Sequence, residues 1–156
     1  SLGAPHFYAF INTENTIIFS ILGVLLFVAA MVFVAAFVLR HQFEVTGDLI
    51  IKMAMLSVLF VPFVLPHMHE RYFFAADVFA VVYAALNKKR WFVPLLVQTA
   101  SLYVYSRYLF GLGFLPVGLA TLPMFAALCV VFKDNYDAAK TRKRQPLILA
   151  RKALQW

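Results

Sequence analysis

Long apolar runs alternate with short polar segments along this chain. Residues 16–39, "TIIFSILGVLLFVAAMVFVAAFVL", carry no charge. At about 1.5 Å per residue, a helix of this length spans a hydrocarbon core of about 30 Å. Four further apolar runs follow, at 49–66, 72–87, 91–110 and 114–132. The pattern predicts an all-α integral membrane protein with five transmembrane helices and a transmembrane domain covering residues 1–132.

Composition strengthens this prediction. Of the 156 residues, 63% are hydrophobic and only 13% are charged. A soluble domain of this size could not cover so much apolar surface, so the bilayer is the expected solvent. Cys129 is the one cysteine of the sequence, so no disulfide can form within a single chain. Because it lies inside an apolar run, we expect a small buried side chain.

The basic residues gather on one side of the predicted membrane domain. Twelve of the 14 Lys and Arg residues fall in the segments after the first, third and fifth runs or at the start of the second. Only Arg71 and Arg107 fall on the other side. Such a bias marks the cytoplasmic side of a membrane protein, so the net charge of +7 indicates topology and no nucleic acid is expected as a partner. The N-terminal segment and the "HMHER" segment are predicted to lie outside.

Residues 133–156 form a basic tail, predicted to be cytoplasmic. In "PLILARKALQW" the apolar residues can share one face beside Arg151 and Lys152. This favours an amphipathic interfacial helix that anchors the chain on anionic membrane lipids, with a docking site for a partner protein as the alternative.

The stretch "LPHMHERYFFAADVF" at residues 65–79 packs ionisable side chains between apolar runs. Arg71 can bind a phosphate in a fork geometry, and histidines can donate hydrogen bonds or move protons near neutral pH. Asp77 comes about two turns into the third run, where a carboxylate is costly unless it is paired or faces water. Helical spacing places Glu70, Phe73, Phe74 and Asp77 on one face. These groups suit a phosphate-bearing polar ligand at the outer interface.

Other interpretations of this stretch remain open. A Glu70–Arg71 pair could simply stabilise a helix start. His67 and His69 could bind a metal with Glu70, although their spacing alone is a weak indication. Arg71 could also contact lipid headgroups only.

The string "LPHMHERYFFAADVFAVVYA", followed by Trp91, Pro94, Gln98 and Ser101, resembles the C-terminal part of bacterial GT-C glycosyltransferases. The subgroup is that of mannosyltransferases related to PIG-V type enzymes, and the opening "SLGAPHFYAF" is similar to another of their segments, with Gly3 and His6 at positions where asparagines are usual. The resemblance implies a polyprenyl-phosphate-linked sugar donor, transfer at the outer face of the bacterial cytoplasmic (inner) membrane, and no cofactor or metal.

The same resemblance implies roles for individual residues. His69, Glu70 and Arg71 would line the pocket for the donor's phosphate and sugar. His67, Tyr72, Asp77 and Gln98 would support that pocket.

One part of the family pattern has no counterpart here. The family's general base is an aspartate in the first outer loop, whereas Glu44, Asp48, Asp134 and Asp137 are predicted to be cytoplasmic and Glu14 stands alone outside. No catalytic residue is therefore assigned. The chain begins at Ser1, so we expect either a removed leader or a longer protein.

Three functions fit this combination of residues. The chain could be the C-terminal portion or a subunit of a glycosyltransferase, completed by its missing N-terminal half. It could be a non-catalytic GT-C-derived subunit that stabilises a larger membrane complex with another membrane protein. It could also be a transport or proton-relay element that uses His67, His69, Glu70 and Asp77.

Overall fold

The computed structural model describes residues 16–41, 46–65, 69–111 and 116–153, and these residues form helices and no strand. The all-α prediction is confirmed. In chain order the elements are α1 (Thr16–His41), α2 (Gly47–Val64), the 3-10 turn η2 (Glu70–Phe73), α3 (Phe74–Leu86), the 3-10 turn η3 (Lys88–Arg90), α4 (Phe92–Phe110) and α5 (Val117–Ala153). Each of the five predicted apolar runs coincides with an α-helix.

Local sequence signals explain several helix ends. The hydroxyl of Thr46 accepts a hydrogen bond from the backbone N–H of Leu49 at 3.4 Å, which caps the start of α2. At the end of α2, Leu65 is extended, as expected for a residue that precedes proline in the sequence. Gly111 ends α4 with φ of 66°, and its N–H donates to the carbonyl of Arg107 at 3.1 Å.

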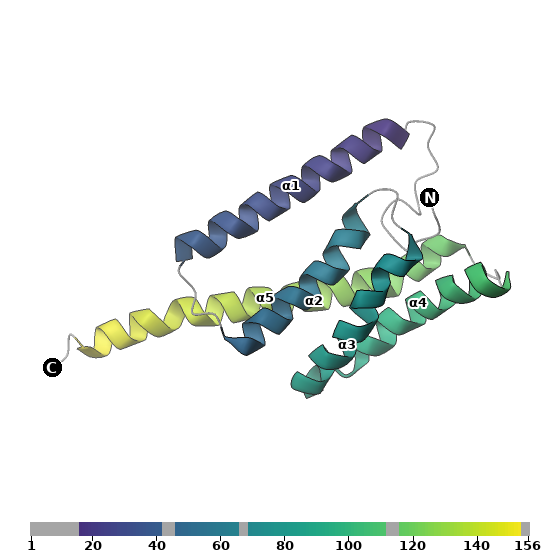
Figure 1. Ribbon diagram of the computed structural model, residues 1–156. Helices are drawn as coiled ribbons and strands as arrows, with labels where there is room; N and C mark the ends of the chain where they lie inside the picture. Colours follow the sequence, from purple (N-terminus) through teal and green to yellow (C-terminus); the bar gives the residue numbers. More distant parts are fainter. Residues whose placement is uncertain (1–15, 42–45, 66–68, 112–115, 154–156) are drawn as a thin grey trace.

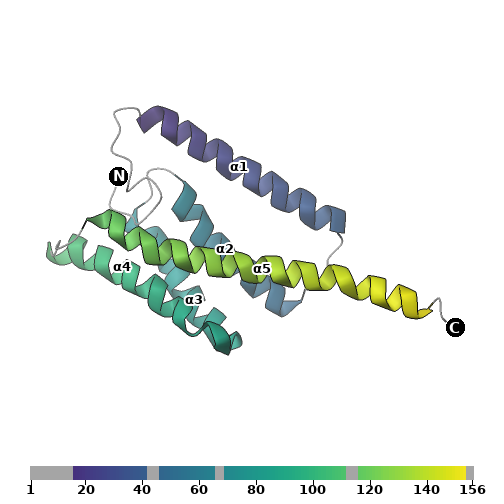
Figure 2. The ribbon, with the colours of Figure 1, turned by 180° about the vertical axis from the view of Figure 1, so that it is seen from behind.

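Helices α2 to α5 form a four-helix arrangement, and α1 stands at its side. Each of the four packs on two others, α2 and α4 both contacting α3 and α5, while α1 packs mainly on α2. Figures 1 and 2 show α1 separated from α3 and α4 by α2. We call the end where α2 and α4 finish and η2 lies the Arg71 end, and the opposite end, where η3 lies, the Arg90 end.

The core between these four helices is apolar and contains many small side chains. Met55, Leu59 and Met124 are fully buried. Alanines on three helices belong to this buried core, and small side chains of this kind allow helices to pack closely; they are Ala76 and Ala80 on α3, Ala100 on α4, and Ala120 and Ala127 on α5. Phe63 and Phe125 stack with ring centroids 5.9 Å apart, which joins α2 to α5.

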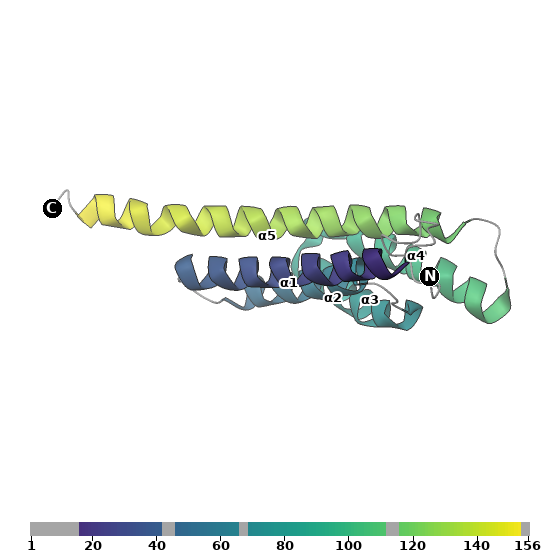
Figure 3. The same cartoon turned by 90° about the horizontal axis from the view of Figure 1, so that it is seen from above.

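Helix α5 departs from the prediction for the tail. It continues as one helix of 37 residues from Val117 to Ala153, and Figure 3 shows it running past the ends of the other helices. A separate interfacial helix after residue 132 is therefore not what the backbone forms, because no break separates the apolar and basic parts. The helix also continues through Pro123 and Pro146, although a proline inside a helix removes one backbone hydrogen bond.

Large apolar side chains cover much of the outer surface. Examples are Ile17 on α1, Phe74 on α3 and Leu102 on α4, which are exposed by 74%, 65% and 69%. Cys129 is also exposed, so the expectation of a buried thiol is wrong. It lies on the outward side of α5, between the buried Leu128 and Val131.

By length and composition, two stretches of the described helices could cross a membrane. They are Gly47–Val64, which is α2, and Val117–Lys140 of α5, while Ser20–Val32 of α1 is a shorter apolar stretch. Helices of this kind also form the cores of soluble proteins, so length alone does not set the number of crossings.

Candidate functional site

The turn η2 carries the predicted site residues at the Arg71 end. The N–H of Tyr72 donates to the carbonyl of His69 at 3.1 Å, which closes the turn. Phe73 is buried and packs where η2 meets α2 and α4, whereas Arg71 and Tyr72 are exposed. The buried ring therefore anchors a short turn whose polar residues face outward.

His69 and Tyr72 form the best-defined contact among the predicted residues. Their ring centroids lie 6.3 Å apart, with the planes tilted by 44°. Within the described part of the chain, no carboxylate lies within ion-pair distance of Arg71. With respect to the described residues, its guanidinium therefore has N–H donors available for water or for a ligand.

Asp77 lies about one turn into α3 and is half-buried. The hydroxyl of Ser101 on α4 is close enough to interact with this carboxyl group. However, Oδ1 of Asp77 and Oγ of Ser101 are buried and lack a hydrogen bond of good geometry among the described residues. Unpaired buried polar atoms are uncommon in native proteins and mark functional or hydrated sites.

The structure corrects the predicted common face. Phe73 is 1% exposed and Phe74 is 65% exposed, so one ring faces the core and its neighbour faces outward. The α-helical spacing used in the prediction also begins only at Phe74, because Glu70–Phe73 is a 3-10 turn.

The remaining predicted residues lie apart from this group or outside the description. Gln98 is exposed on α4, while Ser101 one turn later faces the core. His67 lies outside the described residues, and for Glu70 only the backbone is described. Among the described side chains, no group of three or more His, Cys, Asp or Glu residues could hold a metal ion.

A polar cluster at the Arg90 end is the main feature that sequence reasoning missed. Arg90 binds the carboxylate of Asp134 through two hydrogen bonds, from Nε at 2.7 Å and from Nη2 at 2.5 Å. The hydroxyl of Tyr83, a fully buried residue, donates to the same carboxylate. We call these three residues the clasp, because they join α3 and η3 to α5.

The clasp is largely shielded from water. The side chain of Asp134 is 13% exposed and that of Arg90 is 31% exposed. The hydrogen bond to Asp134 is the main reason why the pKa of Arg90 lies above its ordinary value. Next to the clasp, Nδ2 of Asn135 donates to the carbonyl of Lys52 at 3.0 Å, which ties α5 to α2 as well.

Sequence reasoning treated Arg90 as a loop cation and Asp134 as a tail acid. A usable signal exists in the pattern. Arg90 is the last cation before the fourth apolar run, and Asp134 is the first carboxylate after the fifth. In consecutive antiparallel helices these two positions reach the same end of the bundle.

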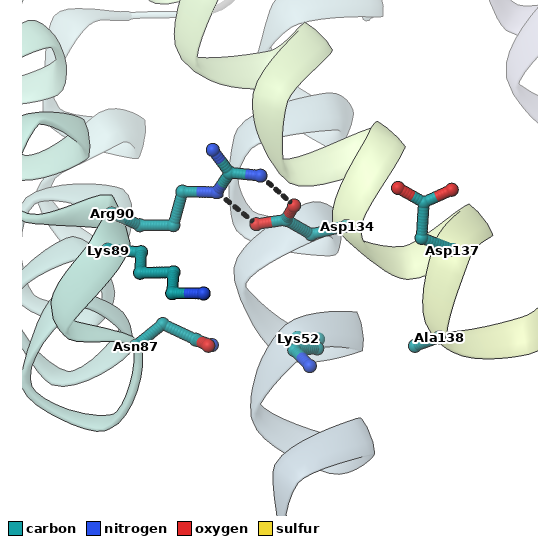
Figure 4. Close-up of a pocket in the computed structure, with 7 residues that line it drawn as sticks. All are labelled: Lys52, Asn87, Lys89, Arg90, Asp134, Asp137 and Ala138. Carbon is teal, nitrogen blue, oxygen red and sulfur yellow. Dashed lines mark hydrogen bonds and ion pairs between the residues drawn. The ribbon is translucent and has the colours of Figure 1, made fainter. Parts of the chain in front are cut away.

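A pocket with a volume of about 320 Å³ lies next to the clasp. Its polar lining residues are Lys52, Asn87, Lys89, Arg90, Asp134 and Asp137. Figure 4 shows Asn87 and Lys89 extending from one side towards α2 and α5, with Asp134 turned to Arg90. Lys52 also pairs with Asp48, with Nζ and Oδ2 2.7 Å apart.

Comparison of the chain with protein-family models, with curated proteins and with solved structures finds no match. The function is therefore argued from the residues themselves.

Proposed function

We propose that this chain is a five-span integral membrane protein that supplies the donor pocket of a polyprenyl-phosphate-sugar-dependent glycosyltransferase. It would be the C-terminal portion or a subunit of that enzyme, in the bacterial cytoplasmic membrane. The observation that carries the proposal is Arg71, an exposed guanidinium with no described carboxylate partner, held on a turn that Phe73 anchors.

The surface supports placement in a membrane. Exposed Ile, Leu, Val and Phe side chains occur on α1, α3, α4 and α5, well beyond the isolated apolar residues normal on a soluble monomer. The charges support an orientation. Lys88, Lys89 and Arg90 lie at one end, and Arg71 and Arg107 lie at the other. The positive-inside rule then favours the Arg71 end outside and the Arg90 end in the cytoplasm.

The chemistry at the Arg71 end suits a phosphate-linked sugar. Arg71 offers two parallel donors to phosphate oxygens, His69 offers a ring N–H, and Tyr72 offers an aromatic face and a hydroxyl. Asp77 and Ser101 lie deeper and have unpaired atoms that a sugar hydroxyl or water could satisfy. The similarity of "MHERYFFAAD" to the GT-C phrase supports the same assignment for His69, Glu70 and Arg71, with His67 and Gln98 in supporting roles.

The test measures sugar transfer in membranes that contain the full-length protein, with polyprenyl-phosphate mannose as the donor. We expect Arg71→Ala to lower kcat/KM by about 10- to 100-fold, because a charge-assisted hydrogen bond contributes about 1.5–3 kcal/mol. Arg107→Ala removes an exposed cation from the same end but outside η2, and should change the rate less than about twofold.

Equal rates for the wild type and Arg71→Ala, with both inserted in the membrane to the same extent, would remove this site assignment. Equal losses for Arg71→Ala and Arg107→Ala would indicate a general surface-charge effect instead of a donor pocket.

A second function is favoured by the position of α1. This helix packs mainly on α2, and Ile18, Leu22 and Leu25 remain exposed on it. Such a helix suits contact with another membrane protein, as in a non-catalytic GT-C-derived subunit of a larger complex. That function predicts co-purification in a fixed ratio with the larger complex and no effect of Arg71→Ala on any transfer activity. Isolation as a free monomer from native membranes would contradict it.

A further inference from the structure

We propose that the pocket at the Arg90 end binds the phosphate group of an anionic phospholipid. This site lies at the opposite end of the bundle from the donor pocket. Its assignment to a lipid rests on the membrane placement proposed above, because only then does the pocket lie at the level of headgroups. The ligand chemistry is that of a phosphate diester in a headgroup without a compensating cation, so that the lipid has one net negative charge.

The first argument is the number of donors in the pocket. Both oxygens of Asp134 are occupied by Arg90 and Tyr83, so the clasp neutralises this carboxylate. Lys52 spends one of its three ammonium donors on Asp48. Lys89 forms no hydrogen bond or ion pair with any described residue, and Asn87 adds a side-chain amide.

The second argument is charge. The lining contains three cations, Lys52, Lys89 and Arg90, and two acids, Asp134 and Asp137, and the ion pair of Lys52 with Asp48 balances the charges, so their positions decide where an anion would lie. Asp137 lies on α5, and in Figure 4 its carboxylate stands on the side of Asp134 away from Lys89. The part of the pocket next to Lys89 is therefore the positive part, and an anion there would meet one ammonium group without a described counter-ion.

The third argument separates a lipid from a soluble anion. Exposed apolar side chains flank the pocket-lining residues along the chain: Leu86 precedes Asn87 and is 58% exposed, and Trp91 follows Arg90 and is 65% exposed. On α5, Phe132 is 60% exposed and precedes Asp134 by two residues. Acyl chains can lie on such side chains while the phosphate occupies the pocket, and exposed Trp is typical of the headgroup level. Basic pockets between membrane helices bind anionic headgroups in this way.

The test uses the purified full-length protein in detergent, supplied with phosphatidylglycerol or phosphatidylcholine, and native mass spectrometry to measure bound lipid. We expect one phosphatidylglycerol to bind more strongly than phosphatidylcholine. Lys89→Ala should lower its affinity about fivefold, since one basic residue near a lipid surface contributes about 1 kcal/mol. Lys88→Ala is the matched control, because it removes the neighbouring exposed lysine, which does not line the pocket.

Equal affinities for the two lipids would overturn the proposal, and so would equal effects of Lys89→Ala and Lys88→Ala. A further measurement compares the Tm of the wild type and of Lys89→Ala in millimolar inorganic phosphate, without lipid. If phosphate raises the Tm of the wild type but not of Lys89→Ala, and phosphatidylglycerol binding does not depend on Lys89, the site takes a soluble anion and the lipid assignment is wrong.

The same measurements keep this site separate from the donor pocket. Arg71→Ala should bind phosphatidylglycerol as the wild type does. If Lys89→Ala binds phosphatidylglycerol as the wild type does, the dependence of sugar transfer on Arg71 is unaffected. If no sugar transfer is measured, the lipid-binding result still stands.

Discussion

Asp134 accepts hydrogen bonds from Nε and Nη2 of Arg90 and from the hydroxyl of Tyr83, in a place where its side chain keeps little contact with water. A carboxylate removed from water is costly unless charged or polar partners replace the solvent. At the residue scale, the clasp is therefore the point where single substitutions should affect folding most clearly.

We expect Arg90→Ala to lower the free energy of unfolding by about 2–3 kcal/mol, because it leaves Asp134 without its cation. This expected loss in the free energy of unfolding is smaller than for a fully buried ion pair, because the Arg90 side chain is partly exposed. Tyr83→Phe removes one of three donors and should cost about 1 kcal/mol. Unfolding in mixed detergent micelles, followed by circular dichroism, measures both effects.

Tyr136→Phe is the control for the hydroxyl, since Tyr136 is 59% exposed on α5 and should stay within about 0.5 kcal/mol of the wild type. A double variant, Arg90→Ala with Asp134→Ala, should be less destabilised than the two single losses added together. Simple additivity would show that the clasp does not act as a unit.

The sequence identified single candidate residues but not the residues that they contact in the fold. It placed His69 and Tyr72 in one short stretch, and local backbone geometry brings their rings together because they are only three residues apart. It did not pair Arg90 with Asp134, because they are 44 positions apart and the end of the bundle that they share was not used to match them. Nor did it separate Phe73, which faces the core, from Phe74, which faces outward, because periodicity alone does not tell which side of a helix its neighbours cover.

At the scale of elements, helix positions followed closely from the apolar runs, because desolvation and backbone hydrogen bonding act over the whole run. The ends were less predictable. The end of α4 at Gly111 has a clear local cause, a left-handed residue. The length of α5 has no such local cause, since the helix continues through the basic residues after Phe132 and through Pro146.

Gly111 gives a direct test at this scale. Gly111→Ala should lower the free energy of unfolding by about 1 kcal/mol, because a Cβ strains a residue with φ of 66° even though no atom lies within 4 Å. Gly47→Ala is the matched control. It also has nothing within 4 Å of an added Cβ, its φ lies outside the left-handed region, and it should be neutral or slightly stabilising. Equal effects of the two substitutions on unfolding would show that α4 does not end in this conformation.

At the scale of the whole molecule, the orientation can be checked by cysteine labelling in intact cells and in inverted vesicles. Cys129→Ser provides the background, because the native thiol is exposed on α5. We expect Gly111→Cys to react with an impermeant maleimide from outside and Lys89→Cys only from the cytoplasmic side, as the charge distribution favours. The opposite pattern would reverse the orientation and place Arg71 in the cytoplasm.

The neighbours of α1 could not be predicted from the sequence. Hydropathy identified α1 as a long apolar helix, but nothing in its sequence indicated that it would pack mainly on α2. That arrangement depends on which helix surfaces fit one another, and apolar residues all round a helix do not specify it.

The uninterrupted course of α5 has a consequence for the basic run at residues 142–144. A helix of 37 residues is about 55 Å long, which exceeds the bilayer hydrocarbon thickness by roughly 25 Å. Residue 143 follows Asp137, which lines the pocket proposed to lie at headgroup level, by six positions, or about 9 Å along the axis, and this is close to one Debye length at physiological ionic strength. If α5 stands upright, salt weakens the attraction between this basic run and anionic headgroups without abolishing it. That attraction should therefore fall steeply as the ionic strength rises.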